Sequence, residues 1–223
     1  MKHIKDKNQI EGYYNHFPLS DYFGFDIRPY ITVVQFEPEE LILQEGEEPE
    51  FLYYLIDGRA KLYLSHDNGR IFLINFLSAP CFIGEMELIQ AQMTSNGVKA
   101  ITACTCFAIR IMSCKEKLLN DTTFLRYICV FLGKKALGNT YNYSRNQSYT
   151  LDVRLAIFIL LTATNGYYRE RHTEVAEFLG VTYRHLLYVL ADFVKSGVLE
   201  KTPQGYHIAN VKVLRRIADG KKE

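Results

Sequence analysis

Short runs of β-branched and aromatic residues fill the first half of the chain, and glycine, proline or asparagine separates them. Such runs bounded by turn residues predict β-strands, and Asn68-Gly69 suits a tight hairpin turn. Many short strands at close spacing are typical of a sandwich or barrel, and we predict a jelly roll. The expected strands are residues 31–36, 41–44, 51–56, 61–64, 70–76 and 106–111.

The period of the apolar residues changes after residue 113. Between 121 and 148 there is no proline, and apolar residues recur at steps of three and four, which predicts a helix about 40 Å long with Asp121 or Thr122 as its cap. Its narrow apolar seam makes it a dimerisation candidate, although packing on its own sheet explains the pattern equally well. The seam residues are Leu125, Ile128, Leu132 and Ala136.

The most specific stretch of the sequence is HTEVAEFLGVTYRHLLYVLADFVKS, residues 172–196, which follows an apolar core helix predicted at 151–164. Thr173 is expected to cap a short helix that Gly180 ends, because glycine adopts the left-handed conformation at least cost. Thr182 then caps a longer helix. A short helix, a tight turn and a longer helix predict a helix-turn-helix.

The second helix of this motif begins with exposed polar and aromatic residues. In a helix-turn-helix these positions enter the major groove, where arginine can pair with guanine. The stretch 198–208 reads as strand, turn and strand, which predicts a wing, with Lys201 positioned for phosphate. A helical hairpin that contacts no DNA is the alternative. The predicted DNA-binding set is Thr173, Thr182, Tyr183, Arg184, His185, Tyr188 and Lys201.

The formal net charge is only +1 but is unevenly distributed. Residues 1–118 hold 11 Lys/Arg against 16 Asp/Glu, residues 119–148 hold 4 against 1, and residues 149–223 hold 11 against 8. An acidic front half and a basic back half favour two domains, with any anionic polymer meeting the back half, although +3 over 75 residues is also within ordinary scatter. From this asymmetry together with the change of period, we expect a β domain at 1–118, a candidate dimerisation helix at 119–148 and a helix-turn-helix domain at 149–223.

Several functional classes have no support in the sequence. The longest apolar run, 155–161, is too short to span a bilayer, and the first residues lack the apolar segment of a signal peptide. Five cysteines without a disulfide spacing indicate a reducing compartment, so we expect a cytoplasmic protein without membrane contact. The usual nucleotide-binding, hydrolase and metalloprotease motifs are missing, so we expect no enzyme and no metal.

The cysteines could nevertheless carry a signal. Cys104 and Cys106 are two residues apart on a predicted strand and therefore share a face. Together with Cys81 and Cys129 they form a candidate redox set, either as a sensing thiol pair or as ligands of an iron–sulfur cluster. The alternative is that they are small buried hydrophobic residues, as free cysteines commonly are.

The order of elements and three segments carry a resemblance to a known family. The segments are GEEPEFLYYLIDGRAKLYL at 46–64, CFIGEMELI at 81–89 and the helix-turn-helix. The chain resembles the CRP/FNR family of bacterial transcription regulators, especially its YeiL branch. The resemblance implies a homodimer on a palindromic double-stranded DNA operator, with the β-roll as sensor and RNA polymerase as a further candidate partner.

The same resemblance identifies candidate effector residues in the β-roll. Cyclic-nucleotide-binding members have a Gly-Glu pair, here Gly84 and Glu85, and an Arg-Ser or Arg-Thr pair, whose positions fall on Ser95 and Asn96. No arginine occurs between 71 and 109. An unpaired buried phosphate costs about 3–5 kcal/mol, so we predict that cyclic AMP is not the effector, whose identity stays open.

Cofactors are not predicted with any certainty. Oxygen-sensing members of the family bind an iron–sulfur cluster through N-terminal cysteines, and no cysteine here precedes Cys81. The sequence as a whole predicts an α+β regulator with an N-terminal jelly roll, a long helix and a C-terminal winged helix-turn-helix. Two alternatives stay open: the helix-turn-helix contacts protein only, or the regulator is constitutive and its sensor empty.

Overall fold

The computed structural model describes residues 1–65, 71–163 and 165–220, and for 142–147 the backbone alone. The chain forms two compact units, Met1–Lys134 and Lys135–Glu223, which are described separately. The boundary falls inside the long helix, and the division at 118 and 148 stays a prediction. Among the described residues, no helix combines the length and apolar character needed to cross a membrane.

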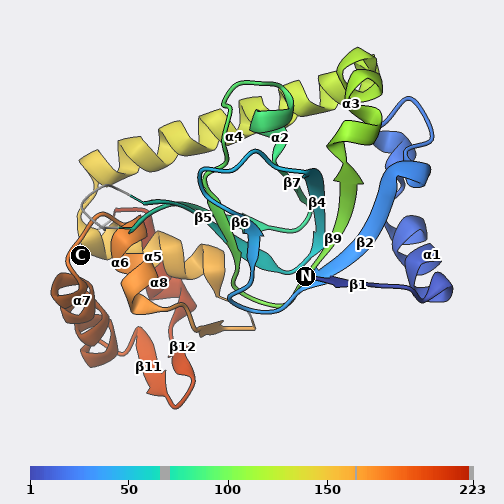
Figure 1. Cartoon of the computed structure of the whole chain (residues 1–223). Helices are drawn as coiled ribbons and strands as arrows, with labels where there is room; N and C mark the ends of the chain where they lie inside the picture. Colours follow the sequence, from blue (N-terminus) through green and yellow to red (C-terminus); the bar gives the residue numbers. More distant parts are fainter. Residues whose placement is uncertain (66–70, 164, 221–223) are drawn as a thin grey trace. The chain divides into compact units, whose positions relative to one another are not determined.

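The N-terminal unit is built on two antiparallel sheets, which confirms the predicted jelly roll within an α+β fold (Figure 1). The predicted strands are present with ends shifted by up to two residues, and the expected turn at Asn68-Gly69 lies outside the described residues. The five-stranded sheet runs β1 (Lys2–His3), β2 (Ile31–Phe36), β9 (Cys104–Arg110), β4 (Phe51–Asp57) and β7 (Cys81–Ile83). The four-stranded sheet runs β3 (Leu41–Leu43), β8 (Gly97–Ala100), β5 (Arg59–Ser65) and β6 (Ile71–Ser78).

Both faces of the five-stranded sheet are apolar. Successive strand residues point to opposite sides, and apolar residues occupy both sets of positions. Tyr54 pairs with Phe107 across β4 and β9 and faces outward, whereas the next pair, Leu55 and Cys106, faces the other sheet. We call the cluster between the sheets the inner core and the cluster on the opposite face the outer core. Strand β4 is therefore buried along almost its whole length.

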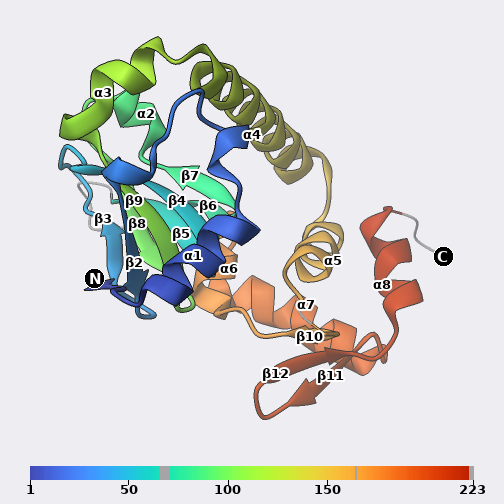
Figure 2. The same cartoon turned by 90° about the vertical axis from the view of Figure 1, so that its right-hand side faces the viewer.

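Helices and the N-terminal segment cover the outer core (Figure 2). Helix α1 carries Tyr14, whose ring stacks on Phe107 with centroids 5.2 Å apart. Phe23, from the segment after α1, stacks on Phe124 of α4 at 5.3 Å. The elements are α1 (Lys7–His16), η1 (Leu19–Asp21), η2 (Arg28–Tyr30), α2 (Glu85–Leu88), α3 (Ile111–Asn120) and α4 (Thr122–Ser148).

The predicted long helix is α4, and its first turn is fixed by Asp121. One carboxylate oxygen of Asp121 accepts a hydrogen bond from the Thr123 N–H at 3.0 Å, as an N-cap does. The other oxygen accepts from the Gly24 N–H at 2.7 Å. A side chain on Gly24 would meet this carboxylate at 2.7 Å, so a larger residue there would displace the Asp121 carboxylate. The carboxylate thus joins the N-terminal segment to the start of α4.

The C-terminal unit is a small helical domain with a three-stranded sheet of order β10-β12-β11. Core helix α5 ends at Thr162, two residues before its predicted end. Strand β10 and helix α8 were not predicted. After α4 the elements are α5 (Leu151–Thr162), β10 (Tyr167–Tyr168), α6 (His172–Phe178), α7 (Tyr183–Lys195), β11 (Leu199–Thr202), β12 (Gly205–Ile208) and α8 (Val211–Ala218).

Candidate nucleic-acid interface and sensor site

The second helix of the motif, α7, begins where the sequence predicts. The Thr182 hydroxyl accepts a hydrogen bond from the His185 N–H at 3.2 Å, which confirms Thr182 as the N-cap. Gly180 in the turn has a φ of +64°, the left-handed conformation expected for it. One face of α7 is buried through Leu186, Val189, Leu190 and Phe193.

Thr173 does not cap the first helix, so this prediction is wrong. Helix α6 begins at His172 with Arg171 in the cap position, and Arg171 makes no side-chain cap hydrogen bond. Thr173 is already a helical residue. The centroid of the His172 ring lies 5.7 Å from that of Tyr206, so the first residue of α6 contacts the wing.

The predicted base-contacting residues all lie on the solvent side of α7. Tyr183 is 48% exposed and Tyr188 is 73% exposed, and Arg184 and His185 are exposed as well. Behind this face, the Arg154 guanidinium of α5 donates a hydrogen bond to the carbonyl oxygen of Leu179. That bond joins the core helix to the turn of the motif and so holds the start of α7 in place against α5.

The predicted wing is the hairpin of β11 and β12. Lys201 pairs with Tyr206 in the register of this hairpin and is exposed. Burial, and to a smaller extent the Lys201 ammonium group, lowers the pKa of the His172 imidazole. Lys201 is therefore close to the start of α6, and β11, the strand that carries it, packs against α7, so the wing adds a cation beside the motif.

The candidate effector residues of the β-roll lie at two places in the fold. Gly84, with a φ of +93°, precedes α2, whose first residue, Glu85, is only 2% exposed. Ser95 and Asn96 precede β8, and the Ser95 N–H donates to the carbonyl oxygen of Glu47 at 2.9 Å. The buried Ser95 hydroxyl has no hydrogen-bond partner among the described residues.

The cation nearest to these positions in the sequence is not directed at them as a phosphate ligand. Lys99 lies in β8, as predicted, and its ammonium nitrogen is 3.9 Å from a carboxylate oxygen of Glu39. The ring of Tyr63 lies against Gly97, where an added side chain would meet the ring at 2.1 Å. Gly97 is therefore a position where only the absence of a side chain lets the Tyr63 ring pack against the strand.

Three of the four candidate redox cysteines meet in the inner core. Cys81 and Cys106 flank Leu55 from opposite neighbouring strands, and Cys104 shares the face of Cys106. Burial raises the pKa of the Cys104 thiol to about 11 and that of Cys106 well above its usual range. Cys129 is exposed on α4, outside this cluster. Within the described ranges, no group of three or more His, Cys, Asp or Glu residues could hold a metal.

The N-terminal unit also contains a pocket that was not predicted. It is lined by residues between 11 and 28, part of which forms α1. The signal that could have found α1 is the spacing of Ile10, Tyr13, Tyr14 and Phe17, which pack against the outer core at steps of three and four.

Comparison with known sequences gives matches over most of the chain. The family of cyclic nucleotide-binding domains matches residues 33–121. The regulatory protein YeiL of Escherichia coli O157:H7 is 46% identical over 200 residues, which cover 90% of this chain and 91% of that protein. The cAMP-activated global transcriptional regulator CRP of Pasteurella multocida is 26% identical over 120 residues, 53% of this chain and 56% of that one.

Solved structures of low sequence identity share the fold. A putative transcriptional regulator of the CRP/FNR family from Eubacterium rectale superposes with a TM-score of 0.78 at 16% identity, covering 92% of this chain and 99% of its own. A CRP-family transcriptional regulator from Thermus thermophilus gives 0.70 at 20% identity, covering 83% and 96%. The match thus extends over both units.

Proposed function

Because the chain belongs to the CRP/FNR family of transcription regulators, in the branch of YeiL, we propose that it binds a palindromic DNA operator as a homodimer. The observation that carries the proposal is the exposed face of α7, capped by Thr182 and flanked by the wing. The relatives are regulators and not enzymes, which supports a non-catalytic role. A regulator of this kind acts on the chromosome, so the proposed compartment is the bacterial cytoplasm.

Base reading is assigned to the first turns of α7. Arg184 is exposed there and can pair with O6 and N7 of guanine, a contact that discriminates by about 1–3 kcal/mol. Tyr183, His185 and Tyr188 extend the same exposed face and would contact bases or thymine methyl groups. Thr182 and Lys201 would contact phosphate. Thr173 is exposed in the first turn of α6 and stays in the proposed DNA-binding set, although it is not the cap.

Dimerisation is assigned to α4, but not through the predicted seam, because Leu125, Ile128 and Leu132 pack in the outer core of their own chain. Ala136, the last residue of that seam, is exposed. Val130, Leu137 and Tyr141 are 52%, 63% and 67% exposed and follow one another at steps of seven and four residues. Gly133 lies between the first two of these residues, and a side chain added there would meet no atom within 4 Å. An exposed apolar stripe with this spacing is the pattern of a two-helix seam. The stripe would pack against the same stripe on α4 of a second copy of the chain.

Selection of bound sequences from a random duplex pool, with reduced ligand-free protein, tests the proposal. We expect enrichment of a palindrome whose half-sites lie about 34–36 Å apart. Arg184→Ala should weaken binding to the selected operator by roughly 5- to 150-fold, the equivalent of one bidentate contact. Arg215→Ala, on α8, removes the same charge away from α7 and should leave the affinity within about twofold.

Salt dependence separates DNA binding from the alternative of a protein-contacting motif. Lys201→Ala should weaken binding to all sequences similarly and reduce the slope of log affinity against log salt by about one. A flat salt dependence, or an Arg184→Ala protein that binds the selected operator as tightly as wild type, would overturn the proposed interface. Enrichment by ligand-free protein would favour constitutive action, and its absence from a folded dimer would favour an effector.

The β-roll is proposed as the sensor, with an effector other than a cyclic nucleotide. Residues 71–109 contain no arginine, and Lys99 is engaged with Glu39. Loss of a guanidinium–phosphate pair costs about 3–5 kcal/mol, so the affinity for cyclic AMP should be at least about a hundredfold below that of an arginine-bearing pocket. Calorimetry with cyclic AMP measures this, and tight binding would contradict it.

A further inference from the structure

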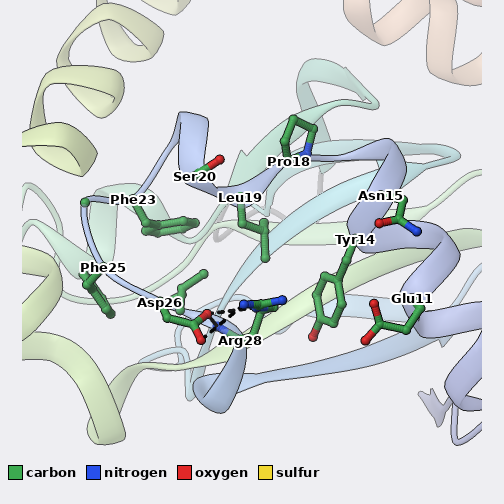
Figure 3. A pocket seen from close by; sticks show the side chains of 12 residues that line it. Glu11, Tyr14, Asn15, Pro18, Leu19, Ser20, Phe23, Phe25, Asp26 and Arg28 are labelled. Carbon is green, nitrogen blue, oxygen red and sulfur yellow. Dashed lines mark hydrogen bonds and ion pairs between the residues drawn. The ribbon is translucent and has the colours of Figure 1, made fainter.

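A pocket of about 470 Å³ lies at the N-terminal segment of the first unit, before the residues that the family match covers. Figure 3 shows side chains of α1 and of the segment that follows it around one common space. The volume is within the range of small-molecule sites. The pocket is lined by residues 11, 14, 15, 18–20 and 23–28.

The polar side of the pocket holds three charged groups. The Arg28 guanidinium is committed to Asp26, since its Nε lies 2.9 Å from Oδ1 of that carboxylate. The Glu11 carboxylate makes no hydrogen bond or ion pair within 4 Å among the described residues, although it helps to raise the pKa of both Arg28 and Tyr14. The charge of Glu11 is therefore the one that the pocket leaves unneutralised.

The apolar side of the pocket is built from the outer core. Leu19, Phe23 and Ile27 are 9%, 3% and 1% exposed and form its floor. The rings of Tyr14 and Phe25 add aromatic walls. On the same aromatic surface, the Lys117 ammonium group lies 6.0 Å from the centroid of Phe25, which indicates that rings here accept a cation.

We propose that this pocket binds a small molecule that carries a protonated amine on an apolar or aromatic body. The amine would pair with the Glu11 carboxylate, with the Asn15 amide and the Tyr14 hydroxyl within the same lining. The body would rest on Leu19 and Phe23. A ligand with only an anionic group would face Glu11 and Asp26 and would have to compete for a guanidinium that is already paired.

The pocket is joined to the start of α4 through its own lining. The Gly24 N–H is hydrogen-bonded to Asp121, and Phe23 stacks on Phe124. The neighbouring Tyr22 ring lies 4.7 Å from that of Tyr127. A ligand that orders the segment from Leu19 to Arg28 therefore also orders the first two turns of α4. An effect of this ordering on operator affinity rests on the proposed function.

Calorimetry on the full chain without DNA tests the site itself. The probes are 2-phenylethylamine, its neutral analogue 2-phenylethanol and its anionic analogue 3-phenylpropionate. We expect the amine to bind with the highest affinity, and Glu11→Gln to weaken it by about tenfold, the effect of one charge-assisted hydrogen bond. Glu48→Gln, which removes an exposed carboxylate from another loop, should change the affinity less than twofold.

Four outcomes would overturn the proposed site. These are equal binding of all three probes, preference for the carboxylate, an amine affinity that Glu11→Gln leaves unchanged, and absence of binding at millimolar concentrations. Asn15→Ala is the second variant. It should weaken binding of the amine without affecting the fold, because Asn15 is exposed on α1.

The connection to α4 has its own readout, also without DNA. Saturating 2-phenylethylamine should slow amide hydrogen exchange at Gly24 and Thr123 in wild type, and Asp121→Asn should reduce the effect at Thr123. Unchanged exchange at both amides would refute the connection. Operator affinity is measured last, so that a protein that binds the amine but not DNA disproves the proposed function and leaves the site standing.

Discussion

The two faces of the five-stranded sheet are both buried, but by different kinds of residue. The inner core contains mostly aliphatic side chains and three thiols, and it is enclosed between two sheets. The outer core combines aliphatic residues with a network of aromatic rings, and helices and the N-terminal segment close it. Side-chain packing sets the spacing on both faces, but only on the outer face does this packing involve helices and many ring contacts.

This difference indicates which face can transmit a change. Phe124 and Tyr127 of the outer core belong to α4, so movement of the N-terminal segment reaches that helix through ring contacts. The inner core reaches α4 at one partly buried residue, Phe131. The comparison therefore predicts that outer-core changes are felt in α4 and that inner-core changes remain in the β-roll.

The largest expected effect is that of Phe82→Ala in the outer core. The Phe82 ring lies 4.7 Å from Tyr54, 5.7 Å from Tyr127 and 5.9 Å from Phe124, and its loss should cost about 3–5 kcal/mol. Leu55→Ala in the inner core should cost a comparable 2–5 kcal/mol, roughly. Urea unfolding followed by circular dichroism measures both.

The two variants differ in a second measurement. Phe82→Ala should speed amide hydrogen exchange in the first turns of α4, and Leu55→Ala should not. Equal acceleration by both would break the distinction between the two faces.

The next effect concerns the thiols of the inner core. Because the pKa of Cys104 is about 11, its thiolate fraction near neutral pH is roughly a hundredfold lower than that of free cysteine. Burial lowers the rate of alkylation further, because it restricts access of the reagent to the sulfur. Alkylation of the native protein should therefore label the exposed Cys129 first. Mass spectrometry after timed quenching identifies the labelled residue, and the rate at Cys104 should rise with pH up to its pKa. Early labelling of Cys104 or Cys106 would revive the redox hypothesis.

A smaller effect is expected for Cys106→Ser, which puts a hydroxyl among apolar neighbours. An unpaired buried hydroxyl should destabilise the protein by about 1–3 kcal/mol. Cys129→Ser, at an exposed position, is the matched control and should stay within about 0.5 kcal/mol. Thermal unfolding of both variants makes the comparison. A Cys106→Ser protein as stable as the control would show that the inner core admits water.

The smallest effect is that of Tyr54→Phe in the outer core. The buried Tyr54 hydroxyl has no partner at hydrogen-bond geometry. Its pKa is raised mainly by burial and also by the nearby hydroxyls of Tyr22 and Tyr127. Removing a hydroxyl without a partner should change stability by less than about 1 kcal/mol, toward stabilisation. A larger loss of stability would indicate that the three hydroxyls are bonded to one another.

How well the sequence predicts each part depends on how local its signals are. Gly180 and Thr182 set the turn and the cap of α7 within three residues, so the helix-turn-helix could be predicted. The cap of α6 could not be predicted, because Arg171 occupies the cap position without a side-chain cap hydrogen bond and so leaves no local signal.

The outer face was missed for a similar reason. Helix α1 has no buried residue of its own, since its apolar side chains are only partly covered. Its apolar residues recur at steps of three and four, but this signal covers only one short helix, and nothing in residues 11–28 resembles a motif. The pocket depends on how that segment packs against the outer core.

The cover that the N-terminal segment gives to the outer core limits how the sensor can be shortened. A chain cut to the matched residues 33–121 would lose β1, α1 and Phe23, and would present a broad aromatic surface to water. Such a fragment should aggregate during expression, because contiguous apolar patches of this kind drive self-association. The smallest soluble sensor has to retain the first thirty residues.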